Sequence, residues 1–444
     1  MKLNVKRTIL VGFAFLAINS FWQMYDSLIP KILTGTFDIP KTYSGIIMAS
    51  DNILALFLLP IFGGLSDRCK SPLGRRRPFI LAGTLVSVVL MIGLPILDNS
   101  YFAAPSSFKI LLFIINLALL LIAMGTFRSP AVALMPDVTP KPLRSKGNAI
   151  INLMGAVGGV LYLIITTVLY SKSRTDGLEH ISYVPIFAIV AGIMLVALFI
   201  IMFFVNEPKL CREQAEYERE HPEENLSIVT DDGKEEIMPK DVKRSLVFLL
   251  LSVAFWYVGY NGITTWFTVY AEEMWGMEVG EASMCLTVAT VGAIVSYIPV
   301  GIVASKVGRK RTIKFGVALL SLCFLTAFLY TLAFHEFHFM LLVLFALVGV
   351  AWAAINVNSL PMVVEMCSGS KVGKFTGLYY TFSMSAQIIT PVVAGWLLDE
   401  ISYKALFPYS AIAVGFAFVT MCFVKHGDSK IEAKTGLSAF DLDD

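Results

Sequence analysis

Three ionisable side chains lie within long apolar segments of the chain: Asp26, Asp51 and Arg128. Each such group costs about 2.5–3.5 kcal/mol to place in hydrocarbon, so each is a candidate for function. Burial favours the neutral form of a carboxyl group, whereas a nearby guanidinium favours the ionised form. A site balanced between these two effects is suited to binding a cation in one conformation and releasing it in another.

Asp51 is the closest of the three to the middle of its segment, and we rank it first for cation coupling. The alternative is a fixed structural ion pair between Asp51 and Arg128. Counting residues places Arg128 roughly 15 Å nearer the cytoplasm at 1.5 Å per residue, so direct pairing would need a long side chain or a bridging water. Asp26, nearer the outer face, is expected to bind ligand hydroxyls or to form an entrance site, the alternative being a solvated residue at a helix end.

Polar and aromatic side chains recur at helical spacing in four of the apolar segments. Such stripes point away from lipid. Aromatic walls with several neutral donors and acceptors suit an uncharged polyol, whereas the alternative is that these residues only pack helices together. Together with Asp26, the predicted ligand-binding residues are Asn19, Trp22, Gln23, Tyr257, Tyr260, Asn261, Thr264, Trp352, Asn356, Tyr380, Ser383 and Gln387.

The segments that carry these residues are predicted to be membrane-spanning helices. Of the 444 residues, 56% are hydrophobic and only 15% are charged, whereas a soluble domain carries about a quarter charged residues. The apolar runs are long enough for helices that cross about 30 Å of hydrocarbon. We predict twelve spans, at residues 8–33, 43–65, 78–97, 108–134, 148–170, 184–205, 245–270, 281–304, 312–333, 339–364, 375–398 and 404–424.

The basic residues set the expected orientation, because cytoplasmic segments are enriched in Lys and Arg. With both termini in the cytoplasm, most of the 35 basic residues fall in inner segments. The sequence therefore predicts an all-α integral membrane protein with both termini cytoplasmic. The exceptions are Arg128 within a span and, in outer segments, Lys31, Lys41, Lys109, Lys172, Arg174 and Lys404.

A short basic hairpin occurs twice, each time between two apolar segments. An acid also follows the fourth span (Asp137) and the tenth span (Glu365). The offset of roughly 230 residues between the copies indicates two parallel six-helix repeats. The first hairpin contains Gly63, Asp67, Arg68, Gly74, Arg75, Arg76 and Arg77, and the second contains Gly308 and Arg309.

The repeat predicts two six-helix bundles, at residues 1–205 and 245–424, joined by a cytoplasmic connector at 206–244 and followed by a cytoplasmic tail at 425–444. Within the connector, residues 211–220 are expected to form a short charged helix and residues 223–234 a mobile linker. The six cysteines show no paired spacing. We expect them to pack as small apolar residues, and we expect no metal site.

The hairpin after the second span, from Gly63 through Asp67 to Arg75–Arg77, resembles the loop motif of the major facilitator superfamily. The longer string that runs on from Ser66 to Ile80 is similar to the sucrose/proton symporter branch of the glycoside-pentoside-hexuronide carriers. The resemblance implies that the hairpin residues form a cytoplasmic gate, with Asp67 near the positive N-terminus of the eleventh span when the carrier faces outward. One departure matters: plant sucrose carriers have an acid in the fourth span, whereas residues 117–123 contain none.

The resemblance and the buried ionisable groups together predict a multi-pass transporter of the cell membrane that couples a cation to uptake of a sugar, such as sucrose or maltose, by alternating access. Protons are the favoured ion, with sodium left open. We expect no cofactor, no nucleic-acid partner and function as a monomer in the lipid bilayer. Two alternatives are proton-driven efflux of amphipathic compounds and a membrane sensor. The chain shows no nucleophile–base set or phosphate-binding loop, so an enzyme is not expected.

Overall fold

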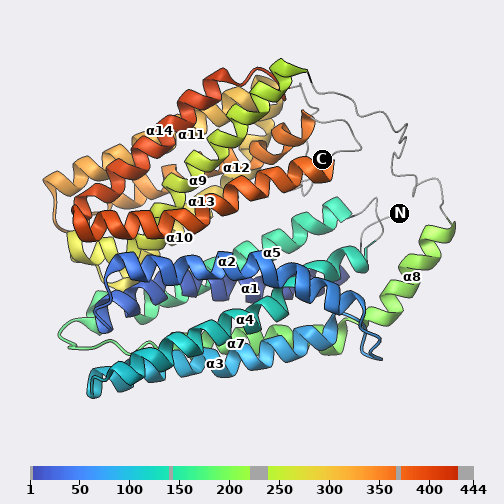
Figure 1. Ribbon diagram of the computed structural model, residues 1–444, viewed down its shortest axis with the longest axis horizontal. Coiled ribbons are helices and arrows are strands. Elements are labelled where there is room, and N and C mark those ends of the chain that lie inside the picture. Colours follow the sequence, from blue (N-terminus) through green and yellow to red (C-terminus); the bar gives the residue numbers. More distant parts are fainter. Residues whose placement is uncertain (1–3, 140–143, 221–238, 367–371, 429–444) are drawn as a thin grey trace. The chain divides into compact units, whose positions relative to one another are not determined.

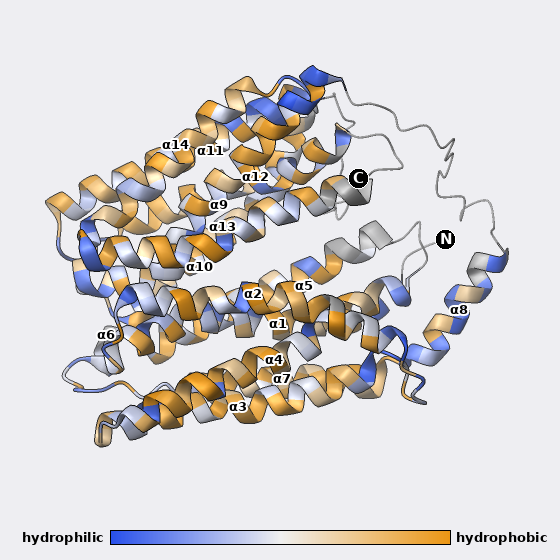
Figure 2. Ribbon diagram, in the orientation of Figure 1, coloured by the Kyte–Doolittle hydropathy of each residue, from blue (hydrophilic) through white to orange (hydrophobic). Residues whose placement is uncertain are grey.

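The computed structural model describes residues 4–139, 144–220, 239–366 and 372–428. Within these residues, twelve helices are long and apolar enough to cross a membrane (Figures 1 and 2). The expected fold class and number of spans are confirmed, while the cytoplasmic location of both termini stays a prediction. The spanning helices are α1 (Val5–Lys31), continued by the π-helical turn Ile32–Thr36, α2 (Lys41–Asp67), α3 (Arg77–Ala103), α4 (Ser107–Asp137), α5 (Arg144–Leu169), α7 (Val184–Phe204), α9 (Lys240–Trp275), α10 (Val279–Val307), α11 (Arg309–Ala333), α12 (Met340–Glu365), α13 (Val372–Glu400) and α14 (Leu406–Phe423).

Large apolar side chains cover the outside of these helices. Val89 on α3 is 72% exposed, Phe203 on α7 is 73% exposed and Phe339, just before α12, is 77% exposed. A soluble protein rarely presents so much contiguous apolar surface to water. Lipid is the solvent that such a surface fits, because it requires no polar cover.

The chain divides into two compact units. Unit 1 contains Met1–Pro40, Ser50–Asn225 and Glu278–Gly280, and unit 2 contains Lys41–Ala49, Leu226–Met277 and Glu281–Asp444. Helix α2 therefore contributes its first turns to unit 2 and the rest of its length to unit 1. Unit 1 also includes the short helix α6 (Lys172–Thr175) and the charged connector helix α8 (Glu207–Glu220). The helix expected at 211–220 is confirmed with an earlier start, and the expected linker at 223–234 lies outside the described residues.

The same helix pairs pack together in both units. In unit 1, α1 packs against α5 and α7, and α3 packs against α4 and α7. In unit 2, α9 packs against α13 and α14, and α11 packs against α12 and α14. Each first helix thus contacts the fifth and sixth of its own repeat, and each third contacts the fourth and sixth. This correspondence is what a duplicated six-helix unit requires.

Small residues allow the closest of these contacts. In unit 1, a Cβ added at Gly158 of α5 would lie 2.1 Å from the carbonyl oxygen of Leu16 on α1. The Ser20 hydroxyl donates a hydrogen bond to the Gly158 carbonyl at 2.9 Å. Close backbone approach and interhelical hydrogen bonds hold helices together where lipid replaces water, since the hydrophobic effect gives little there.

Candidate functional site

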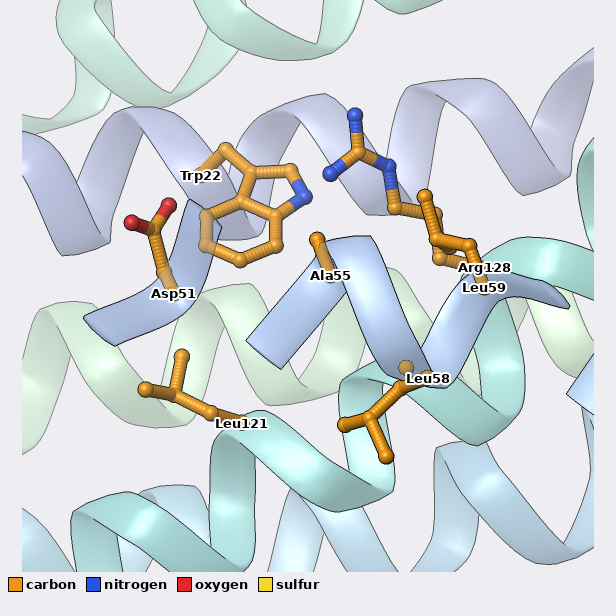
Figure 3. A pocket seen from close by; sticks show the side chains of 8 residues that line it. Trp22, Asp51, Ala55, Leu58, Leu59, Leu121 and Arg128 are labelled. Atoms are coloured by element: carbon orange, nitrogen blue, oxygen red, sulfur yellow. The ribbon is translucent and has the colours of Figure 1, made fainter. Parts of the chain in front are cut away.

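The three ionisable residues within the spans, all half-buried, come together within unit 1. Asp26 lies on α1, Asp51 on α2 and Arg128 on α4, and each of them interacts electrostatically with the other two. Asp51 and Arg128 line a single pocket, whose other walls are Trp22, Ala55, Leu58, Leu59, Leu121 and Gly125 (Figure 3). The separation expected from counting residues does not keep them apart, because the long Arg128 side chain reaches the same pocket.

Asp51 and Arg128 do not form the direct ion pair that was the alternative to a coupling role. Neither group has a salt bridge within 4.0 Å among the described residues. One Asp51 carboxylate oxygen accepts hydrogen bonds from the backbone N–H of Asn52 at 2.5 Å and from its Nδ2 at 2.7 Å. In the view of Figure 3, the Trp22 ring lies between the Asp51 carboxylate and the Arg128 guanidinium. The two charges therefore share a pocket with an aromatic ring between them.

Trp22 contacts Arg128 through its ring face. The guanidinium carbon lies 5.4 Å from the ring centroid, within the range of cation–π interactions, which are worth roughly 2 kcal/mol or more when desolvated. The indole is held at its edges by Phe21 and Tyr25, with centroid distances of 5.1 and 5.4 Å. Trp22 was predicted to bind ligand. Its ring contacts Arg128 and lines the pocket, and its ligand-binding role stays a prediction.

Two tyrosines near Asp26 were missed by sequence reasoning. Tyr25 and Tyr162 are both buried and both interact electrostatically with Asp26. The Tyr162 hydroxyl is 2.7 Å from the Ser27 hydroxyl, whereas the Tyr25 hydroxyl has no hydrogen-bond partner among the described residues. The only feature of the sequence that could have pointed to Tyr25 is its position directly before Asp26. Tyr162 is brought there by the packing of α5 on α1.

Unit 2 contains a cluster of aromatic residues from several helices. Tyr260 on α9 and Trp352 on α12 stack in parallel, with centroids 3.8 Å apart and planes inclined by 10°. Tyr257 meets the same Trp352 edge to face at 5.5 Å. These three residues were predicted as ligand-binding from their stripes, and the structure brings them into direct contact.

Hydroxyl and amide groups border this aromatic cluster. The Tyr379 hydroxyl lies 2.9 Å from the Ser359 hydroxyl and 3.5 Å from that of Tyr257. Tyr297 on α10 forms a hydrogen bond with the predicted residue Asn356. Tyr379 and Tyr297 were not predicted. Neither one belongs to the stripes that pointed to the cluster, and their roles emerge only from packing.

The remaining predicted ligand-binding residues have a variety of settings. Asn19 is exposed, and its side chain donates to the Phe15 carbonyl at 3.0 Å. The side chains of Thr264, Ser383 and Gln387 donate to carbonyls of their own helices. Tyr380 is 50% exposed, Gln23 is half-buried, and the Asn261 Nδ2 atom is buried without a hydrogen-bond partner in the described part of the chain.

The basic hairpin of unit 1 forms a network of ion pairs at the ends of α2, α3 and α4. Arg76 pairs with Asp67, and its Nε lies 2.7 Å from Asp137 Oδ2. Arg75 also reaches Asp137, at 3.4 Å. Although burial opposes its charge, the bonds to Asp137 and Asp67 hold the pKa of the Arg76 guanidinium above its ordinary value. Gly63 contributes a carbonyl to Arg76 at 3.3 Å, whereas Arg68 is exposed.

Glu207, at the start of α8, caps the N-terminus of α3. Its buried carboxylate accepts hydrogen bonds from the backbone N–H groups of Arg75, Arg76 and Arg77 at 2.8, 3.0 and 3.0 Å. Gly74 has φ of +109°, and a Cβ there would lie 2.3 Å from a Glu207 carboxylate oxygen. The first turn of a helix leaves backbone donors unpaired, and Glu207 satisfies them from a distant part of the sequence.

Unit 2 repeats this arrangement with different residues. Arg309 Nη1 lies 2.6 Å from Glu365 Oε2, as Arg76 pairs with Asp137. Gly308 has φ of +103°, and Asp428 accepts the backbone N–H of Lys310 at 3.0 Å. In each unit, then, an acid after the sixth span binds the turn that opens the third span.

The twelve candidate spans and the match to a family of transporters identify a multi-pass membrane transporter, not an enzyme. The chain belongs to the Major Facilitator Superfamily, whose family model matches residues 11–277 and 271–440.

Curated relatives match a smaller part of the chain. It is 34% identical over 153 residues to sucrose transport protein SUC3 of Arabidopsis thaliana, covering 32% of this chain and 25% of that protein. It is 31% identical over 170 residues to SUC4 of the same plant, covering 36% of this chain and 33% of that protein. The matched region thus spans a quarter to a third of the length of these relatives.

Solved structures resemble the fold over nearly the whole chain. A D-xylose-proton symporter aligns with a TM-score of 0.69 at 14% identity, covering 96% of this chain and 99% of that one. The xylose transporter XylE from E. coli aligns with a TM-score of 0.68 at 15% identity, covering 97% and 98%. At this identity the likeness supports the fold alone.

Proposed function

We propose that the protein is a cation-coupled sugar symporter that works by alternating access. The observation that carries the proposal is that the ionisable residues and the aromatic residues form separate clusters, one in each unit. The ionisable cluster of Asp26, Asp51 and Arg128 lies in unit 1, and the aromatic cluster around Trp352 lies in unit 2. The curated relatives named as sucrose transport proteins favour a sugar as the substrate.

Charge counting describes the coupling step. When Asp26, Asp51 and Arg128 are all ionised, the cluster carries one net negative charge inside the membrane. A buried uncompensated charge is unfavourable. The net negative charge of the empty cluster therefore opposes the conformational change between the outward-open and inward-open states. Binding of one proton, or one sodium ion, neutralises the cluster and removes this barrier. One cation per sugar is the stoichiometry that follows.

Protons suit the cluster better than sodium. Sodium needs several oxygen ligands around one point. The cluster offers as acidic ligands only the second Asp51 oxygen and the Asp26 carboxylate, which are too few. A proton needs a single carboxylate oxygen, and Asp51 already holds its other oxygen in bonds to Asn52. The buried Tyr25 hydroxyl, which has no hydrogen-bond partner among the described residues, is an additional donor beside Asp26.

Sugar recognition is assigned to the aromatic cluster of unit 2. The faces of Trp352 and Tyr260 suit the C–H faces of a sugar ring, and the hydroxyl groups of Tyr257, Tyr379 and Ser359 suit its hydroxyl groups. All of these groups are neutral, which fits an uncharged substrate. A disaccharide such as sucrose or maltose is our first candidate.

The hairpin network is proposed to act as the cytoplasmic gate. Asp67 is 56% exposed even though it pairs with Arg76, so it is available to exchange partners. The expected interaction of Asp67 with the N-terminus of the eleventh span belongs to a different conformation and stays a prediction.

Uptake of labelled sucrose and maltose into proteoliposomes tests the proposal. An inward proton gradient, a sodium gradient and no gradient are compared for the wild type and for Asp51→Asn. We expect gradient-dependent accumulation in the wild type, and loss of accumulation in the variant with sugar exchange retained. Sugar accumulation driven by the sodium gradient alone would identify sodium as the coupling ion instead of the proton. Absence of sugar uptake by folded protein under every gradient would favour efflux of amphipathic compounds instead.

A further inference from the structure

The N-terminus of α2 is capped by an acid from another helix. The Asp399 carboxylate, near the end of α13, accepts hydrogen bonds from the backbone N–H of Lys41 at 3.0 Å and of Thr42 at 2.6 Å. It also accepts the Thr42 hydroxyl at 2.8 Å and lies 3.4 Å from the Lys41 ammonium group. Residue Pro40, at the N-cap position, offers no side-chain bond of its own. Asp399 therefore supplies the capping that the local sequence lacks.

The backbones of the two helices approach closely at this point. A Cβ added at Gly45 of α2 would lie 2.2 Å from the Pro391 carbonyl oxygen on α13. A Cβ added at Gly395 of α13 would lie 2.3 Å from the Lys41 carbonyl oxygen. The Lys41 ammonium group also lies 4.6 Å from the centre of the Tyr403 ring. Two glycines, a charged cap and a cation–π contact thus act at one junction.

Helix α2 links this junction to the gate at its other end. Its first turns belong to unit 2, where α13 lies, and its remaining length belongs to unit 1. Asp67 is the last residue of α2, at the end opposite Lys41. The distribution of basic residues assigns the Asp67 end to the cytoplasm and the Lys41 end to the outside. Both helices have an acid near the C-terminal end, namely Asp67 on α2 and Asp399 on α13.

We propose that Asp399 is an outer latch, which holds the outer end of α2 on α13 and must release its backbone N–H groups before the carrier opens outward. The latch is the counterpart of the Asp67 gate. Loss of the latch favours the outward-open state, and loss of the Asp67 gate favours the inward-open state. This inference rests on alternating access and not on the identity of the sugar or the ion. Its test consequently uses a readout that requires no transport.

A cysteine at position 44 reports on the latch. Ser44 lies next to the capped turn and is fully buried, and Ser44→Cys changes the side chain by a single atom. Labelling of this cysteine by a membrane-impermeant maleimide, added from outside, is measured with and without Asp399→Asn. Labelling of the chain without the Ser44→Cys change is subtracted to remove the contribution of the native cysteines. The matched control is Glu400→Gln, which removes a charge from the neighbouring, exposed residue at the end of the same helix.

Asp399→Asn keeps one acceptor oxygen, so one of the two backbone N–H groups loses its partner. An unpaired donor costs about 1 kcal/mol or more, so we expect the variant to speed labelling roughly fivefold to tenfold. Lys41→Gln, which keeps both capping N–H groups, should speed it by only about twofold to threefold, because the ion pair it removes is long, at 3.4 Å, and such pairs contribute little. Glu400→Gln should leave the rate unchanged. Adding Asp67→Asn to Asp399→Asn should slow the labelling again, because it releases the opposite gate.

The proposal would be overturned if monodisperse Asp399→Asn protein labelled at the wild-type rate. It would also be overturned if Glu400→Gln accelerated labelling as much as Asp399→Asn, since the effect would then be general loss of charge. If the Asp399→Asn protein is not monodisperse, Lys41→Gln decides, and an unchanged rate in that variant contradicts the latch. Failure of the proposed sugar specificity would affect none of these results.

Discussion

Glu207 offers the prediction whose magnitude is best defined by the structure. Its carboxylate accepts three backbone N–H groups at the start of α3, at 2.8, 3.0 and 3.0 Å, and its side chain is almost fully buried. Glu207→Ala leaves all three donors unpaired. A buried unpaired donor costs about 1 kcal/mol or more, so the loss should be about 3 kcal/mol. Glu207→Gln retains one acceptor oxygen, and its loss should be about half as large.

Thermal unfolding in detergent, followed by circular dichroism, measures this effect. At about 2–4 °C per kcal/mol, Glu207→Ala should lower the apparent Tm by roughly 6–12 °C. Glu213→Gln is the control on the same helix, because Glu213 forms a half-exposed pair with Arg7 at 2.8 Å and such pairs are worth about 1 kcal/mol or less. A Glu207→Ala variant that loses no more Tm than Glu213→Gln would refute the capping role.

Four further predictions follow from the two sites and the gate. Arg128→Gln should reduce gradient-driven uptake at least ~10-fold while the protein stays folded, because two buried carboxylates are then uncompensated; unchanged accumulation would contradict the charge count. Tyr260→Leu should raise the KM for sugar roughly threefold to tenfold through loss of aromatic stacking, and Tyr260→Phe should not; initial uptake rates measure both. Asp67→Asn should slow turnover and leave the KM nearly unchanged, and normal turnover would contradict its gating role. Burial, with the charges of Glu207 and Asp137, raises the pKa of Cys211 to about 11, so its maleimide labelling at pH 8 should be ~100-fold slower than that of an ordinary thiol and rise with pH up to about pH 11.

The fold was largely predictable because its signals are local. Long apolar runs predicted the twelve spans, and the repeated hairpin predicted the duplication that the matching helix pairs display. The charged connector helix was also predictable, apart from its start at Glu207. Hydropathy and helical spacing act over a few turns, so a single sequence contains them.

The sites were less predictable because they depend on packing between distant segments. Helical spacing found Tyr260 and Trp352, which stack at 3.8 Å. It could not find Tyr379, whose partner Ser359 lies on another helix. Spacing also favoured Asn19, whose side chain donates to a carbonyl of its own helix, and its ligand-binding role stays a prediction. The cap that Glu207 places on α3 joins residues 130 positions or more apart, and no local pattern encodes it.

The central claim is that the acids of unit 1 carry one cation for each sugar transported. The most direct test measures sugar-induced charge movement and sugar uptake together in the same proteoliposomes. The account predicts one positive charge per sugar in the wild type. In the Asp51→Asn variant, whose cluster is neutral without a bound cation, it predicts no charge movement, with sugar exchange retained. Sugar uptake without charge movement in the wild type, or undiminished charge movement in the Asp51→Asn variant, would contradict it.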